Sequence, residues 1–192
     1  ILMNLDEAFA LDPLNSNFRI IGRDKELKEI LYRIMAGGML LIECKEGNGK
    51  TAMLKYAIDN FRGKGKVIYA NAEKLNKRLD IAQLIRKRPK GMILLLDNVH
   101  YLSNKNSEKI KYFYDEDRIK SVVFTTPSYS MVNFNDAIKE RIGRNVIKLS
   151  KLSEEDVLEM IKDRIGNSEM LSDEVIIEVY KDSGNVREVL MK

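Results

Sequence analysis

Residues 39–61 constrain this chain more than any other part of it. A short apolar run, Met39–Ile42, is followed by a loop that ends in Gly-x-Gly-Lys-Thr over residues 47–51, and then by an amphipathic run. A strand, a glycine-containing loop and a helix in this order form a phosphate-binding (Walker A) loop. Its backbone N–H groups converge on a phosphate that also lies at the positive end of the helix. The sequence therefore predicts a strand–loop–helix unit that binds a phosphorylated ligand.

A second motif supports the first. Met92–Asp97 is an apolar run that ends in a carboxylate, as in the Walker B strand that accompanies such a loop. Lys50 is then expected to reach the β- and γ-phosphates, while Thr51 and Asp97 hold Mg²⁺, the aspartate usually through water. The residues that we predict to surround the phosphates are Glu46, Gly47, Asn48, Gly49, Lys50, Thr51 and Ala52.

One residue departs from the pattern of the loop. Cys44 holds the position of the first glycine in Gly-x-x-x-x-Gly-Lys-[Ser/Thr]. That glycine has no Cβ and makes a turn easy to form. We therefore expect Cys44 to strain the loop slightly or to change the path by which the chain enters it. The alternative interpretation is a simple turn between a strand and a helix that contains Gly-Lys-Thr by chance.

The composition narrows the class of protein. With 44% hydrophobic and 32% charged residues, the 192-residue chain has enough apolar side chains for a sizeable core. The single cysteine excludes an intramolecular disulfide and is typical of a reducing compartment. No apolar stretch approaches the roughly twenty residues that a membrane span needs, and the first residues are unlike a signal peptide. We therefore expect a cytoplasmic protein without a membrane contact.

The charge of the chain permits a nucleic-acid partner without requiring one. The formal net charge is +4, and the run 86–90 alone contains four basic side chains. Such a run is usually only a solvated connector. The alternative is a surface that contacts phosphates.

Short apolar runs alternate with amphipathic runs along the first 150 residues. The predicted strands cover residues 39–42, 67–70, 92–97, 121–126 and 145–149, and the predicted helices include 74–86 and 104–115. This alternation predicts an α/β fold, a P-loop NTPase with a five-stranded parallel sheet flanked by helices. Ligands of such sheets bind at the carboxyl ends of the strands.

The pattern changes after residue 150. Three helical runs follow without a further strand, so we divide the chain into a nucleotide-binding domain at 1–150 and a small helical lid domain at 151–192. Residues 1–18 are expected to be an irregular lead-in. The last helical run begins near Gly184 and the sequence ends inside it, so we expect the second domain to be truncated.

The order of these motifs resembles that of the AAA+ ATPases, and within them the branch of archaeal origin-recognition initiators and clamp loaders. The resemblance covers nearly the whole chain. Its matches are Ile-Gly-Arg-Asp at 21–24, Gly-x-Gly-Lys-Thr at 47–51, Leu-Asp-Asn-Val-His at 96–100, Ala-Ile-Lys-Glu-Arg at 137–141 with the run 151–155 beyond the next strand, and Ser-Gly-Asn-Val-Arg at 183–187. Each match is weak alone, but their order is typical of the family.

The resemblance implies ATP or ADP as the ligand and assigns further roles. Ile20 and Ile21 would contact the adenine, and Arg187 would reach the nucleotide from the lid as the sensor 2 residue. Arg141 would act as an arginine finger on the γ-phosphate of a neighbouring subunit, with Arg144 as the alternative. The chain is therefore expected to form a homo- or hetero-oligomer through the nucleotide interface.

The resemblance also points to the residues of ATP hydrolysis. Thr126, or failing that Thr125, would orient the attacking water. The family usually has a glutamate directly after the Walker B aspartate, whereas this chain has Asn98. An amide cannot accept the proton of the water, so we expect ATP binding with slow turnover. His100, the only histidine, could take the base role, although packing or capping is the simpler interpretation.

Three functions fit these expectations. The first is a slow ATP-dependent switch in an oligomeric assembly on DNA, similar to replication-initiation or clamp-loading proteins. The second is an archaeal signalling or defence NTPase module of the STAND type. The third is a catalytically silent subunit that binds ATP to stabilise a hetero-oligomer. The intact gene would separate them, because a winged helix after residue 192 favours DNA work and helical repeats favour signalling.

Overall fold

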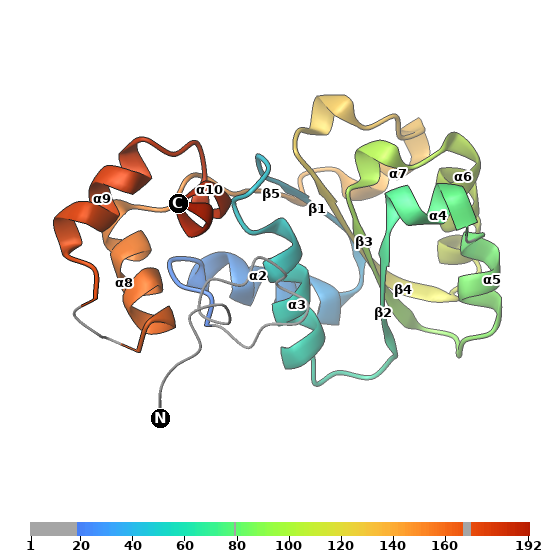
Figure 1. The fold of residues 1–192 in the computed structure, drawn as a ribbon. Coiled ribbons are helices and arrows are strands. Elements are labelled where there is room, and N and C mark those ends of the chain that lie inside the picture. Colours follow the sequence, from blue (N-terminus) through green and yellow to red (C-terminus); the bar gives the residue numbers. More distant parts are fainter. Residues whose placement is uncertain (1–18, 79, 167–169) are drawn as a thin grey trace.

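The computed structural model describes residues 19–78, 80–166 and 170–192 and contains a central parallel sheet (Figure 1). Its five strands lie in the order β2-β3-β4-β1-β5, and every neighbouring pair runs parallel. The strands are β1 Gly38–Glu43, β2 Val67–Asn71, β3 Met92–Asp97, β4 Ile119–Thr126 and β5 Val146–Lys148. The prediction of an α/β fold with a five-stranded parallel sheet is confirmed.

Helices cover both faces of the sheet. On one face lie α2 Asp24–Ala36 and α3 Lys50–Asn60, and on the other α4 Ala72–Arg78, α5 Ile81–Arg86, α6 Asn104–Asp115 and α7 Asp136–Ile142. The strand β3 shows how the two layers are joined. All six of its side chains are buried, and neighbours such as Leu94 and Leu95 pack into the clusters on opposite faces. A strand buried on both sides shows no polar alternation, as is typical of parallel sheets.

The predicted helix over residues 74–86 is wrong in one respect, because two helices, α4 and α5, occupy this stretch. The Asp80 carboxylate accepts a hydrogen bond of 2.8 Å from the N–H of Ala82 and so caps the start of α5. The same carboxylate accepts two hydrogen bonds of 2.7 Å from Lys109 on α6. An aspartate directly before an apolar run is a known start signal, so the sequence contained the clue.

The three helices after β5 pack around an apolar cluster of their own (orange to red in Figure 1). They are α8 Glu154–Arg164, α9 Asp173–Lys181 and α10 Val186–Met191. Ile21, from the segment before α2, joins their cluster next to residues such as Val157. Ser153 and Asp156 form a reciprocal capping box at the start of α8. The helices after β5 were expected, while the domain division at residue 150 stays a prediction.

Two short 3₁₀ helices, η1 Val99–Tyr101 and η2 Tyr129–Met131, follow β3 and β4. The lead-in predicted for residues 1–18 lies outside the described residues. None of the described helices combines the length and the apolar character that crossing a membrane requires.

Candidate functional site

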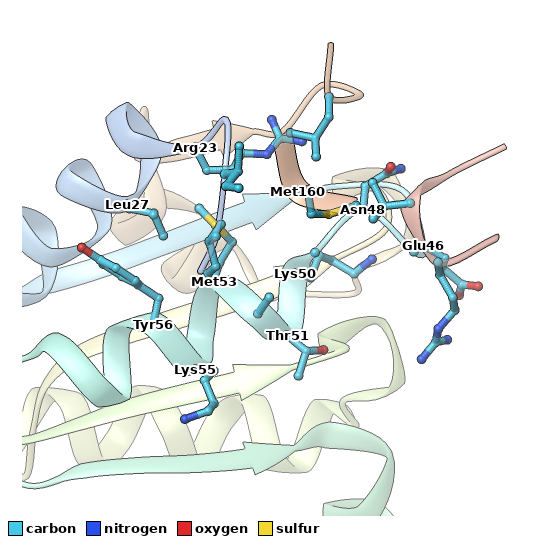
Figure 2. A pocket seen from close by; sticks show the side chains of 18 of the residues that line it. Arg23, Leu27, Glu46, Asn48, Lys50, Thr51, Met53, Lys55, Tyr56 and Met160 are labelled. Atoms are coloured by element: carbon cyan, nitrogen blue, oxygen red, sulfur yellow. The ribbon is translucent and has the colours of Figure 1, made fainter. Parts of the chain in front are cut away.

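A cavity of about 760 Å³ lies between the phosphate-binding loop and the C-terminal helices. Its walls come from the segment before α2, from the loop and first turns of α3, from the chain after β3, and from α8 and α10. Figure 2 shows Lys50 and Thr51 at the start of α3, with Arg23 and Met160 above them in this view. This is the carboxyl-end position expected for a ligand of a parallel sheet.

The loop between β1 and α3 depends on its two glycines. Gly47 and Gly49 have φ values of 75° and 98°, a left-handed backbone that favours glycine. Cys44 has no such backbone, and its buried side chain packs into the cluster beneath α2 and α3. Its Sγ lies 3.6 Å from the carbonyl oxygen of Asn48, and burial raises the pKa of the thiol. The cysteine therefore takes the place of the usual glycine without backbone strain.

Lys50 begins α3 and points back into the loop. Its side chain is only 7% exposed, and Nζ donates a hydrogen bond of 2.7 Å to the Cys44 carbonyl. Burial lowers the pKa of the ammonium, an effect that Cys44, Asp97 and Glu46 partly offset. A buried ammonium held by a single carbonyl can turn its remaining N–H groups towards phosphate oxygens.

The carboxylate of Asp97, at the end of β3, is 1% exposed and accepts hydrogen bonds from several elements. Thr51 donates to Oδ2 at 2.7 Å, and the Tyr69 hydroxyl donates to the same oxygen at 3.1 Å. The Thr125 hydroxyl and the N–H of Asn98 donate to the other oxygen, Oδ1. These contacts fix the orientation of the carboxylate.

The paired oxygens of Thr51 and Asp97 fit Mg²⁺ that is bound together with phosphates. Mg²⁺ prefers oxygen ligands and keeps several waters, and the hydroxyl and carboxylate oxygens here are adjacent. Within the described parts of the chain, no group of three or more His, Cys, Asp or Glu side chains could hold a metal by itself. A metal ion would therefore need phosphate oxygens and water as further ligands.

The residues directly after the Walker B carboxylate have an unusual environment. Asn98 has a left-handed backbone, with φ 56° and ψ 49°, and asparagine tolerates this region better than most residues. His100 lines the cavity, and its buried Nδ1 has no hydrogen-bond partner among residues 19–78, 80–166 and 170–192. Burial lowers the pKa of His100, and the charge of Glu46 partly offsets this effect.

The cavity brings together most of the residues that the sequence predicts to bind nucleotide. Ile20, Ile21 and Arg187 line it together with residues 46–52 and Asn98. Arg187 comes from α10, at the far end of the chain from the two isoleucines. What these residues do toward a nucleotide stays a prediction.

Two close contacts connect the C-terminal helices with the rest of the site. A Cβ on Gly47 would lie 2.2 Å from Oδ1 of Asn185, the residue that caps α10. The N–H of Arg187 also donates a hydrogen bond of 3.1 Å to the Gly47 carbonyl. At the second contact, a Cβ on Gly22 would lie 2.5 Å from the carboxyl carbon of Asp156 in α8. The position of these helices is therefore tied to the phosphate-binding loop and to the segment before α2.

Three predicted residues do not line the cavity: Asp97, which lies behind Thr51, and Thr126 and Arg141. Thr126 is buried, and its hydroxyl donates a hydrogen bond of 2.9 Å to the carbonyl of Ser128, whereas Thr125 is the threonine that contacts the Walker B carboxylate. Arg141 lies on α7 and forms an ion pair of 2.6 Å with Asp115. A finger that acts on a neighbouring subunit need not line the cavity of its own subunit, so the roles of Thr126 and Arg141 stay predictions.

Sequence reasoning missed several residues of the site. Arg23 is only 5% exposed, and its guanidinium donates to the carbonyl of Ser150, which ties the segment before α2 to the chain leading into α8. Tyr69 and Glu73 reach the site from β2 and from α4. Only the position of β2 beside β3 brings these two residues near the Walker B carboxylate, and the sequence pattern does not contain that information.

The profile of a family described as AAA domain matches residues 39–158 of this chain. No curated protein matches the chain significantly. Many solved structures share its fold, and three of them illustrate the likeness.

Cdc6p from Pyrobaculum aerophilum has 18% identity and a TM-score of 0.72, with 96% of this chain and 63% of that chain covered. The RuvB Holliday junction branch migration motor of Thermotoga maritima has 17% identity and a TM-score of 0.71, with 94% and 64% covered. The ORC1 protein of Aeropyrum pernix, solved in complex with DNA, has 15% identity and a TM-score of 0.73, with 95% and 60% covered. The chain thus spans less than two thirds of the length of each, and the likeness concerns the fold.

The family match contains both the phosphate-binding loop, which lines the cavity, and the Walker B strand, whose Asp97 accepts a hydrogen bond from the cavity residue Thr51. It extends over more than half of the chain. The chain therefore belongs to the AAA domain family, and its fold is that of an AAA+ ATPase resembling the archaeal initiator branch.

Proposed function

We propose that the chain binds ATP and hydrolyses it slowly, as a nucleotide switch in an oligomeric assembly on DNA. The cavity is the observation that supports this proposal most. It combines the buried ammonium of Lys50, the Thr51 hydroxyl with Asp97 behind it, and the guanidinium of Arg187. Together with the N–H groups of a glycine loop, these groups form a cradle for a chain of phosphates.

Each part of the cradle has a separate task in the proposed complex. The N–H groups of residues 47–51 bind the β-phosphate, and Lys50 exchanges its contact with the Cys44 carbonyl for phosphate oxygens. Bound Mg²⁺ would neutralise charge on the phosphate oxygens. Arg187 approaches from α10, which is hydrogen-bonded to Gly47. A phosphate in the loop would therefore bias the position of the C-terminal helices, which is what a switch requires.

Slow hydrolysis follows from the residue beside the Walker B carboxylate. Asn98 offers an amide that cannot accept a proton from water. Its left-handed backbone would also be strained with a glutamate in its place. Both the chemistry and the backbone at this position therefore favour a protein that keeps ATP bound and hydrolyses it slowly.

We propose that Arg141 takes part in assembly through the nucleotide interface, as a finger on the neighbouring subunit. This arginine lies in the last turn of α7, where its only ion pair among the described residues is with Asp115. Light scattering with and without ATP should show assembly that is lost in Arg141→Ala and retained in Arg144→Ala. If Arg141→Ala retained both assembly and hydrolysis, the finger role would be excluded.

A role on DNA is supported by two relatives in fold. One is described as a Holliday junction branch migration motor, and another was solved in complex with DNA. The net charge of +4 on this chain agrees with an anionic partner.

Calorimetry with ATP, in the presence and absence of Mg²⁺, tests the central part of the proposal. We expect one site per chain, with affinity that falls when Mg²⁺ is chelated, because Thr51 and Asp97 then lose their ion. Phosphate release should be measurable but slow. If no heat of binding were detected, the proposed function would be withdrawn.

A further inference from the structure

The positive charge of this chain is concentrated in two turns. Residues 62–66 and 86–90 together contain seven basic side chains and no carboxylate, out of 33 basic and 29 acidic residues in the whole chain. Without these ten residues the chain would have more carboxylates than cations. The excess of cations over carboxylates in this protein therefore comes from these two turns.

The structure brings the two turns side by side. They lead into β2 and β3, which are neighbouring strands, and the N–H of Ile93 donates a hydrogen bond of 2.9 Å to the carbonyl of Lys66. A Cβ on Gly65 would lie 2.5 Å from the carbonyl oxygen of Gly91, so the two backbones touch. Figure 1 shows both turns at the lower edge of the sheet, the amino end, away from the phosphate-binding loop. Their cations therefore lie at the same edge of the sheet.

The cations of this surface are available to a partner. All except the half-buried Arg88 are exposed, and none forms an ion pair with a described carboxylate. The guanidinium of Arg62 donates only to backbone carbonyls. By contrast, Lys55 and Lys109 on neighbouring helices are paired with carboxylates. A polyanion would not have to displace an internal partner.

We propose that residues 62–66 and 86–90 bind the phosphodiester backbone of double-stranded DNA, independently of base sequence. The proposal rests on the proposed function on DNA and assigns it a surface at the opposite end of the sheet from the nucleotide. Exposed lysine and arginine side chains can contact the phosphates that repeat along the DNA backbone. Surfaces that insert into membranes carry large apolar side chains beside their cations, and these ten residues contain only Pro89 as an apolar side chain.

A matched pair of triple variants tests this surface by fluorescence anisotropy with a labelled duplex at several salt concentrations. The test variant carries Lys64→Ser, Lys66→Ser and Lys90→Ser. The control carries Lys25→Ser, Lys28→Ser and Lys151→Ser, which remove the same charge from exposed positions elsewhere. We expect the test variant to bind DNA about tenfold more weakly or worse, with a salt slope smaller by about 2 to 3. The control should stay close to the unmodified protein.

Three outcomes would overturn the proposal. They are an equal loss in both triple variants, no duplex binding by the unmodified protein, and tighter binding to phosphatidylserine vesicles than to the duplex. Calorimetry with Mg-ATP on the same samples reports separately on the nucleotide site. A failure of the DNA surface is thereby distinguished from a failure of the proposed ATP binding.

A different observation concerns the carboxylates of the cavity. Among the described residues, four acidic side chains line it: Asp24, Glu46, Asp59 and Glu73. Asp59 is held by Lys55 at 2.6 Å, and Asp24 belongs to the first turn of α2. Glu73 follows β2, whose last residue, Asn71, is paired in register with the Walker B carboxylate. It is therefore the lining carboxylate in the first turn of the helix that follows the strand next to Asp97.

One contact and one electrostatic effect agree with this placement. The hydroxyl of Tyr69, also on β2, reaches Oδ2 of Asp97 at 3.1 Å. Burial lowers the pKa of His100, and the charges of Glu46, Asp97 and Glu73 oppose this effect, with Glu46 contributing most and Glu73 least. Tyr69 from β2 thus reaches the Walker B carboxylate, and Glu73 from α4 lines the same cavity as Asn98.

We infer that Glu73 is the catalytic carboxylate that Asn98 cannot be, and that the slow hydrolysis in the proposed function goes through it. Glu73 takes one proton from the attacking water as the water oxygen bonds to the γ-phosphorus. The bond from this phosphorus to the bridging oxygen breaks, and its electron pair stays on ADP. The proton leaves for solvent as phosphate departs. The base then lies in the first turn of α4, which follows the strand beside the Walker B strand, and not directly after the Walker B aspartate.

Glu73→Gln, Glu46→Gln and, as a control, Glu116→Gln on the far surface separate the possible bases. We expect Glu73→Gln to slow phosphate release at least about tenfold and to weaken binding of ADP with fluoroaluminate, while the Kd for ATP is unchanged. Unchanged turnover in Glu73→Gln, a larger loss in Glu46→Gln, or no hydrolysis by the unmodified protein would each overturn the inference. An absence of ATP binding would instead refute the proposed function.

Discussion

The two ends of the parallel sheet use polar residues in opposite ways. At the carboxyl end, Lys50, Asp97 and Thr125 are buried, and each is hydrogen-bonded within the protein. At the amino end, the turns 62–66 and 86–90 present exposed cations without a carboxylate partner among the described residues. Burial of a polar group requires a fixed partner, whereas an exposed cation needs only water.

This difference determines what a substitution can change. At the carboxyl end, the groups that would bind a nucleotide also hold the strand ends together, so binding and stability should change together. At the amino end, a cation can be removed with little effect on folding, because exposed charges contribute little to stability. The following predictions test whether the carboxyl end behaves as one connected unit.

The largest effect is expected at Lys50. Lys50→Ala removes the ammonium predicted to contact the phosphates, and about two charge-assisted hydrogen bonds correspond to about 3 kcal/mol, or roughly a hundredfold in Kd for ATP. Lys45→Ala is the matched control, because Lys45 belongs to the same loop but is exposed and does not line the cavity. Calorimetry with Mg-ATP measures both. Equal losses would mean that the loop responds only to net charge.

The second effect concerns packing against the C-terminal helices. Gly22 and Gly91 have nearly the same φ, 71° and 74°, but a Cβ would meet Asp156 at the first and nothing within 4 Å at the second. We expect Gly91→Ala to lower the free energy of unfolding by about 1 kcal/mol through backbone strain. Gly22→Ala should cost about 2 kcal/mol more because of the clash. Urea denaturation measures the difference, and similar losses would show that Asp156 moves aside easily.

The elements that depend on local pattern could be predicted from the sequence. The uninterrupted apolar run before Asp97 gave β3 its bounds, and the helical spacing over 104–115 gave α6 its bounds. The glycines and the Lys-Thr pair of the phosphate-binding loop fixed the start of α3 to within two residues. Each of these signals lies within a few neighbouring residues, so one stretch of sequence is enough to read it.

The contacts between distant strands could not be predicted. Residues 125 and 126 are both fully buried, so a pattern of burial cannot tell which threonine meets Asp97. The answer depends on the pairing of β3 with β4, just as the approach of Glu73 depends on the pairing of β2 with β3. The left-handed backbone of Asn98 also has no signal beyond the tolerance of asparagine for it.

The two threonines at the end of β4 provide the third prediction. Thr125→Val removes a hydroxyl bound to a buried carboxylate and an acceptor for the N–H of Asn98, which should cost about 2 kcal/mol of stability. Thr126→Val removes only a hydrogen bond to the Ser128 carbonyl, which should cost about 1 kcal/mol. Thermal unfolding with and without Mg-ATP compares them. A greater loss of ATP stabilisation in Thr126→Val would restore Thr126 as the residue facing the nucleotide.

The smallest effect is a pH dependence at His100. Burial lowers the pKa of its imidazole in the folded protein, and Lys50 adds to this while Glu46, Asp97 and Glu73 oppose it. Between this lowered pKa and the ordinary value of 6.5, the unfolded chain binds a proton that the folded chain does not. The free energy of unfolding should therefore fall as the pH decreases through this window.

His100→Gln should remove that part of the decline, because glutamine does not titrate. Urea denaturation at about pH 7.5 and about pH 5.5, on either side of the usual pKa of histidine, measures the decline in both proteins. Carboxylates such as Glu46 remain in the variant. A fall in the free energy of unfolding that both proteins share therefore comes from groups other than His100. An identical decline would show that the ring is not enclosed at the carboxyl end, and this residue would then behave like the exposed groups of the amino end.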